Sequence, residues 1–193
     1  MKKTLVAVAV TLLIGCASEP KEPAAPPVDP NVAQARGIVK NFATALQGEL
    51  QAGLQAGGPT NAIAVCKDKA PAIAKAEQQK SGWKDVGRTS LKLRNPSNEP
   101  DDWELAVLKK FEARKAAGED PTKIELSEVV AAGDKKTFRY MKAIPTQEVC
   151  LACHGETIDK ATAAKLAKLY PKDKARGFKV GDLRGAFTLS KDL

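Results

Sequence analysis

The chain has 193 residues, of which 31 are Lys or Arg and 23 are Asp or Glu, so its formal net charge is +8. The lysines are spread over amphipathic segments and form no single cluster, which argues against a nucleic-acid-binding protein despite the basic balance. The sequence has no internal repeat and no phosphate-binding glycine loop, so it gives no sign of a repeat architecture or a nucleotide-binding domain.

The first fifteen residues have the pattern of a secretory signal peptide. Lys2 and Lys3 form a cationic start, and a mostly apolar run over residues 5–14 follows them. This run is too short for a membrane-spanning helix, which needs about 20 apolar residues. We therefore expect residues 1–15 to be removed on export, which lowers the formal charge from +8 by the two lysines that leave with them.

The Leu-Ile-Gly-Cys stretch that ends at Cys16 resembles a bacterial lipobox, in which signal cleavage precedes a cysteine that receives diacylglycerol. Several acyl chains on Cys16 would anchor a soluble domain stably, whereas a single chain would not. The next residue is Ala17 and not Asp, so nothing indicates retention at an inner membrane. Residues 16–30 are rich in proline and predict an extended, lipidated tether. We expect a periplasm-facing lipoprotein of the cell envelope, held at the outer membrane, with its folded domain over residues 31–193.

The folded domain begins with helical patterns. Apolar residues at helical spacing predict a long helix over residues 32–56, which Gly57 and Gly58 end. A second helix is expected to begin at Ala62. Pro71 is expected to kink or split this helix, because proline has no N–H to donate inside a helix.

The middle of the chain mixes a strand, a loop and a helix. Residues 85–92 alternate and contain β-branched side chains, which predicts a short strand. Residues 95–100 carry the Asn and Pro of a loop. Asp101 and Asp102 then lie at the predicted start of a helix that runs to about Ala117, where the helix dipole favours carboxylates.

The last third of the chain predicts strands around a short helix. Residues 124–130 and 136–143 are two strands that join across a Gly-Asp turn, which is a hairpin pattern. Residues 161–169 predict a helix, and residues 185–190 predict a further strand. Helices followed by antiparallel strands are typical of an α+β fold.

A C-x-x-C-H motif runs from Cys150 through Cys153 to His154, and this is the attachment motif of c-type haem. The two thiols add to the two vinyl groups of the porphyrin, and the adjacent imidazole reaches the iron from the same side. His154 is the single histidine of the chain and directly follows its single C-x-x-C. The motif and the export signal together predict one covalent haem c.

Three other interpretations of these residues are weaker. A thioredoxin-like redox pair needs a βαβ context and gives no reason for the histidine. A zinc site built from Cys66, Cys150, Cys153 and His154 has enough ligands, but neighbouring Cys153 and His154 would aim poorly at one tetrahedral ion. A disulfide between Cys150 and Cys153 would be strained at this spacing.

Cys66 is the one cysteine left without an assigned bond. It lies on the apolar stripe of its predicted helix, so it is either a second axial ligand of the iron or a small buried core residue. Met141, a lysine or no ligand at all are the alternatives for that iron position. Four basic residues are candidate partners of the haem propionates, with ordinary surface charge as the alternative for each: Arg88, Lys92, Arg94 and Arg139.

The chain resembles a bacterial family of single-haem c-type proteins. The blocks that carry the resemblance are residues 61–66, 87–96, 139–145, 150–155 and 181–187. The resemblance extends over residues 31–193 and implies a PAS-like antiparallel sheet with N-terminal helices packed around one covalently bound haem. It also implies a cysteine–histidine axial pair, with His154 as the proximal ligand and Cys66 as the distal ligand.

Two functions are consistent with these expectations. The first is a low-potential electron carrier that exchanges electrons with an unidentified redox protein, because a thiolate ligand stabilises ferric iron. The second is a redox or gas sensor in which Cys66 is displaced and a partner supplies the output. No output domain is expected in the sequence, which favours electron transfer. An enzyme such as a peroxidase ranks third, because it would need an open iron face.

Overall fold

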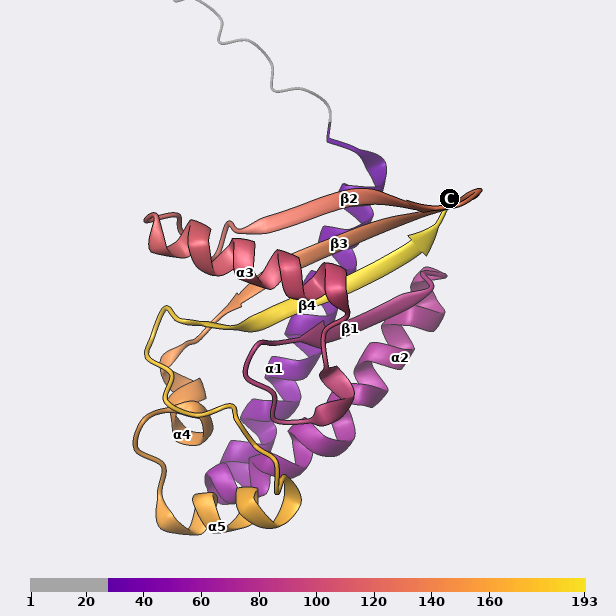
Figure 1. Ribbon diagram of the computed structural model, residues 1–193. Coiled ribbons are helices and arrows are strands. Elements are labelled where there is room, and N and C mark those ends of the chain that lie inside the picture. The colour runs from indigo at the N-terminus through magenta and orange to yellow at the C-terminus, as the bar shows by residue number, and fades with distance from the viewer. Residues whose placement is uncertain (1–27) are drawn as a thin grey trace, which may run out of the picture.

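The computed structural model describes residues 28–193 and shows an α+β fold in three layers (Figure 1). Helices α1 and α2 cover one face of a four-stranded sheet, and α3 covers the other. The predicted signal peptide and lipidation site lie outside the described residues. Within residues 28–193, no helix is both long enough and apolar enough to span a membrane.

Helix α1 (Pro30–Ala64) begins one residue inside the predicted tether. The Asp29 carboxylate caps it by accepting a hydrogen bond from the Asn31 N–H at 2.7 Å, and a proline is well tolerated at the first helical position. The helix is kinked where Gly57 and Gly58 leave helical geometry, with φ of 178° and 68°. The predicted break between two helices is therefore present as a kink.

After α1 the chain continues as a π-helix, Val65–Lys69, which leads directly into α2 (Ala70–Ser81). Pro71 explains the π-helix. It has no N–H to donate, and its ring would collide with the carbonyl of Lys67 in a regular α-helix. The Ala70 N–H instead bonds to the carbonyl of Val65, five residues earlier.

The sheet is antiparallel throughout, with strand order β1-β4-β3-β2. Its strands are β1 (Asp85–Thr89), β2 (Glu125–Ala132), β3 (Lys135–Pro145) and β4 (Leu183–Asp192). The predicted hairpin between β2 and β3 turns at Gly133, whose φ of 61° suits glycine. Strand β4 lies between β1 and β3, so it joins the two halves of the sheet.

The remaining helices are shorter than α1. Helix α3 (Asp102–Ala116) starts with a capping box, because the Asp101 carboxylate accepts from the Glu104 N–H and the Glu104 carboxylate accepts from the Asp101 N–H. Helices α4 (Leu151–His154) and α5 (Lys160–Leu169) lie at the end of the sheet where β3 finishes (Figure 1). Single turns of 3₁₀-helix occupy Pro96–Asn98 and Glu148–Cys150.

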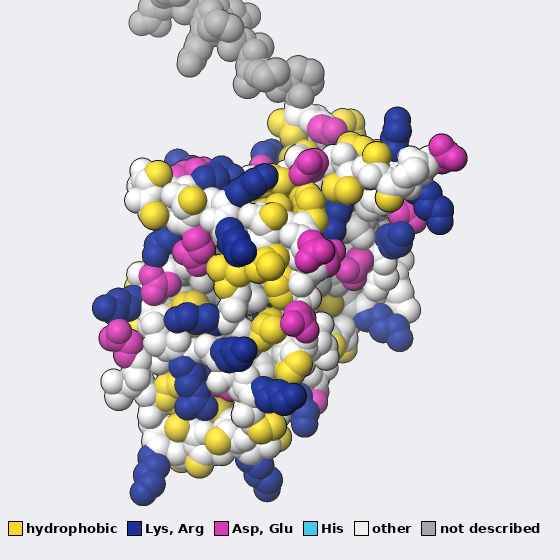
Figure 2. All heavy atoms as spheres, in the orientation of Figure 1, with side chains coloured by type: hydrophobic (Ala, Val, Ile, Leu, Met, Phe, Trp, Pro, Cys, Tyr) yellow, Lys and Arg dark blue, Asp and Glu magenta, His cyan; other side chains and the backbone are white. Residues whose placement is uncertain are grey.

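Alternate residues of β3 pack into two separate hydrophobic cores, one on each face of the sheet. Phe138 and Tyr140 pack under α1 and α2, whereas Met141 and Ala143 pack under α3. Charged side chains of both signs are interspersed on the face of the molecule seen in Figure 2, as expected for an ordinary solvated surface.

Candidate functional site

A cavity of about 390 Å³ opens between α1, the π-helix, the ends of β3 and β4, and α4. Its volume lies in the range of sites for small organic ligands. Apolar side chains of α1 form much of its wall, among them Val39, Leu46, Leu50 and Leu54. The cavity is therefore suited to a large, mostly apolar ligand.

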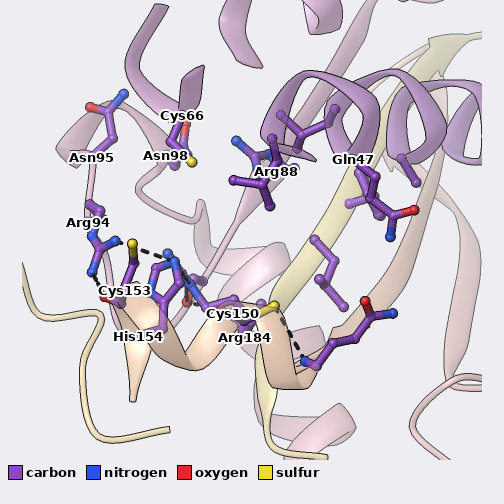
Figure 3. Close-up of a pocket in the computed structure, with 18 of the residues that line it drawn as sticks. Gln47, Cys66, Arg88, Arg94, Asn95, Asn98, Cys150, Cys153, His154 and Arg184 are labelled. Atoms are coloured by element: carbon purple, nitrogen blue, oxygen red, sulfur yellow. Dashed lines mark hydrogen bonds between the residues drawn. The ribbon is translucent and has the colours of Figure 1, made fainter. Parts of the chain in front are cut away.

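Four of the residues singled out in the sequence line this one cavity: Cys66, Cys150, Cys153 and His154. Cys150 ends a turn of 3₁₀-helix, and Cys153 and His154 lie on α4. Cys66 arrives from the π-helix, and Figure 3 shows its sulfur on the other side of the cavity from the α4 residues. These three cysteines form no disulfide.

His154 is held with one ring nitrogen turned to the backbone and the other turned inward. Its Nδ1 lies 2.8 Å from the carbonyl oxygen of Ala175, so Nδ1 carries the proton and donates it. Its Nε2 lies 3.4 Å from Arg184 Nε and 3.5 Å from Arg94 Nη1. Burial, followed by these two guanidinium groups, lowers the pKa of His154 to about 3. The imidazole is therefore neutral at neutral pH and keeps a lone pair on Nε2.

A buried ion pair frames this histidine. The guanidinium of Arg94 donates to both oxygens of Asp173 at 3.2 Å, and the side chains are only 7% and 2% exposed. The same guanidinium donates to the carbonyls of Cys153 at 2.5 Å and of Ala175 at 3.1 Å. Arg94 thus links the C-x-x-C-H segment to Ala175, whose carbonyl accepts the hydrogen bond from His154 Nδ1.

Arg184 is a cavity residue that our reasoning from sequence missed. Its Nη1 donates to the Ser90 hydroxyl at 3.1 Å and to the Lys92 carbonyl at 3.3 Å. Burial, followed by the charges of Arg94 and Arg88, lowers the pKa of Arg184 to about 10. Its sequence signal is its place in the block over residues 181–187, one of the blocks that carry the family resemblance.

Arg88 lines the cavity as a propionate partner would, but Arg139 does not. Arg139 shares the α3 face of β3 with Met141, because alternate residues of a strand point to opposite faces. There it pairs with Asp101 at 2.7 Å and with Glu104 at 3.4 Å. The structure therefore does not bring Arg139 to the cavity, and Met141 on the same face does not line it either.

Cysteine sulfur, the His154 imidazole, arginine and lysine cations, and neutral amide and hydroxyl groups are the polar groups of the residues that line the cavity. No Asp or Glu lines it. Within residues 28–193, no three side chains of His, Cys, Asp or Glu converge as a metal-binding group of their own.

Comparison with known proteins gives two matches. The family model described as Tll0287-like (Tll0287) matches residues 25–191. The crystal structure of the cyanobacterial heme-protein Tll0287 is similar to this chain, with a TM-score of 0.63 and 26% sequence identity over 84% of this chain and 95% of that one. No match was found among curated proteins.

Proposed function

This chain belongs to the Tll0287-like family, and we propose on that premise that it binds one haem c through Cys150 and Cys153. The observation that carries the proposal is the convergence of both thiols and the His154 imidazole on one apolar cavity. A similar solved chain is a heme-protein by description, which supports the same cofactor here.

The residues present fit a porphyrin. The cavity offers an apolar wall, two thiols three residues apart and a neutral imidazole with a lone pair on Nε2, and iron binds imidazole in that form. A thioredoxin-like pair fits less well, because burial raises the pKa of the Cys153 thiol, whereas a reactive redox cysteine needs a lowered one.

We further propose that His154 and Cys66 are the two axial ligands. Both line the cavity, and they come from segments on different sides of it (Figure 3). Met141, the main alternative, is fully buried in the core under α3. A four-stranded antiparallel sheet flanked by helices is also compatible with a PAS-like fold, which is our proposal for the fold class.

Electron transfer is the function that this arrangement supports best. Bound haem would supply a one-electron couple between ferric and ferrous iron, and a thiolate ligand would keep its potential low. The chain would enclose the porphyrin and fill both axial positions, which leaves no open position for a substrate. We propose an envelope lipoprotein, anchored through Cys16, that exchanges electrons with a redox partner protein.

A haem-based sensor is the second candidate, and the π-helix favours it. Cys66 lies in Val65–Lys69, and π-helical turns are rare and occur often at functional sites. A sensor would require the cysteine on this π-helical turn to leave the iron on reduction or gas binding. Spectra of both oxidation states distinguish the two functions, because a simple carrier keeps the same ligands in each.

The covalent bond is tested on protein purified from the envelope. Acidified acetone should leave the haem on the polypeptide, and the double variant Cys150→Ala/Cys153→Ala should lose all haem that resists the acid. Cys66→Ala is the control, because it should keep the covalent haem. A purified protein that contains zinc and no porphyrin would contradict the proposal.

A further inference from the structure

The side chains that line the cavity carry more positive charge than the nearby carboxylates neutralise. Four cationic side chains line it, and no Asp or Glu does: the four are Arg88, Arg94, Lys142 and Arg184. Arg94 is paired with Asp173, and Lys142 lies 3.6 Å from Glu125. No carboxylate of residues 28–193 lies within 4.0 Å of the other two guanidinium groups.

Neither unpaired guanidinium is free in bulk water. Arg88 extends into the cavity, with its guanidinium carbon 5.6 Å from the centre of the Phe42 ring (Figure 3). Arg184 is held by neutral acceptors only, namely the Ser90 hydroxyl, the Lys92 carbonyl and Nε2 of the neutral His154 imidazole. Charges in such surroundings are costly unless a counter-charge accompanies them. The missing counter-charge must therefore come from what fills the cavity.

We propose that Arg88 and Arg184 bind the two carboxylate groups of the haem. This inference rests on the proposed function. A ferric porphyrin core carries one net positive charge, and a thiolate from Cys66 would cancel it. The two carboxylates then remain, and they match the two unpaired guanidinium groups one for one.

The two arginines are also well placed to act together. Arg88 lies on β1 and Arg184 on β4, and these strands are hydrogen-bonded neighbours. A guanidinium can donate two parallel hydrogen bonds to one carboxylate, which an ammonium group cannot. Arg94 and Arg139 are left out of this role, because Asp173 in one case and Asp101 in the other already neutralise them.

The test uses the haem-loaded protein with Arg88→Gln and Arg184→Gln, each followed by resonance Raman spectroscopy and a redox titration. Each variant should shift a propionate bending mode, because a carboxylate loses its hydrogen bonds. Each should also lower the midpoint potential, since a positive charge near the iron is removed. Arg139→Gln is the control and should leave both the propionate modes and the potential unchanged.

If a glutamine variant does not fold, a lysine variant at the same position still keeps the positive charge. Arg88→Lys and Arg184→Lys should hold the potential near its original value while still shifting the propionate modes. Propionate modes that stay unchanged in all variants would overturn the inference. If an Arg184 variant loses the imidazole ligand while its propionate modes stay intact, the proposed role of Arg184 is overturned. Arg184 would then be a residue that positions His154. Failure of the proposed function looks different, since the unmodified protein would then carry no covalent haem.

Discussion

Asp173→Asn is the sharpest test of how the histidine is held. The Asp173 carboxylate accepts four hydrogen bonds: two from Arg94 at 3.2 Å, one from the Ala175 N–H at 2.9 Å and one from Arg176 at 3.0 Å. An amide keeps only one acceptor oxygen and turns its NH₂ group towards a guanidinium. The substitution therefore leaves the Arg94 charge buried without its counter-charge.

The magnitude follows from the burial of both partners. The side chains are 7% and 2% exposed, and removing one partner of a buried pair costs about 3–5 kcal/mol. Taking the lower figure, about 3 kcal/mol corresponds to a fall in the melting temperature of roughly 6–12 °C for a domain of this size. Loss of the Arg94 contacts should also loosen α4, which carries His154, from the segment around Ala175.

Urea denaturation followed by far-UV circular dichroism measures this change, with both proteins in the same haem state. Asp192→Asn is the matched control, because Asp192 pairs with Lys84 at the surface, and both side chains are more than half exposed. The control should change the unfolding midpoint little. An Asp173 variant no less stable than the Asp192 variant would refute our account of the buried pair.

The effect of Asp173 should depend on pH. Burial raises its pKa, but hydrogen bonds from Arg94, Ala175 and Arg176 and the Arg94 charge outweigh burial and lower it overall. A carboxylate with a lowered folded pKa stabilises the protein above its unfolded pKa of about 3.9, and this contribution is lost as the pH falls through the folded value. The unfolding midpoints of the two proteins should therefore converge in acid.

Three further predictions concern single residues. Cys66→Ala should give a high-spin ferric haem that binds added imidazole, and Cys66→Met should raise the midpoint potential; an unchanged spectrum would make Cys66 a core residue only. Gly185→Ala should lower the unfolding free energy by about 2 kcal/mol or more, because φ is 155° and the added carbon would lie 2.2 Å from the Thr89 oxygen. Gly87→Ala on the neighbouring strand meets only a methyl at 3.8 Å and should change stability much less in the same urea titration. Cys16→Ser should stop incorporation of radiolabelled palmitate, and persistent labelling would contradict the lipobox interpretation.

The helices and the hairpin could be predicted because their signals are local. Capping residues, glycine and apolar spacing act within a few residues of where they stand, and the structure has α3, α5 and the β2–β3 turn where they were expected. The strand predicted over residues 85–92 ends instead at Thr89. The Ser90 hydroxyl donates to the carbonyl of Arg184 at 2.7 Å and accepts a hydrogen bond from the Lys92 N–H. Side-chain hydrogen bonds therefore replace the backbone pairing between strands beyond Thr89.

The cavity could be predicted only in part, because some of its contacts join residues that are far apart in the sequence. The C-x-x-C-H motif could be recognised because its residues are contiguous in the sequence. The pairing of Arg94 with Asp173 joins residues far apart in the chain, and no spacing rule connects them. The position of Arg139 follows from a simple rule, because two-residue alternation along β3 places it on the same face as Met141.

The place of β4 in the sheet has a consequence for the order of events during biosynthesis. The chain is made from its N-terminus, so α1, β1, β3 and α4 all precede β4, and β1 cannot join β3 until β4 lies between them. Strand β4 also supplies Arg184, Gly185 and Phe187 to the cavity wall. Cys150 and Cys153 are therefore synthesised before the wall that encloses them, which leaves an interval in which a large rigid molecule can reach both thiols. Docking of β4 then closes the cavity around whatever has been attached.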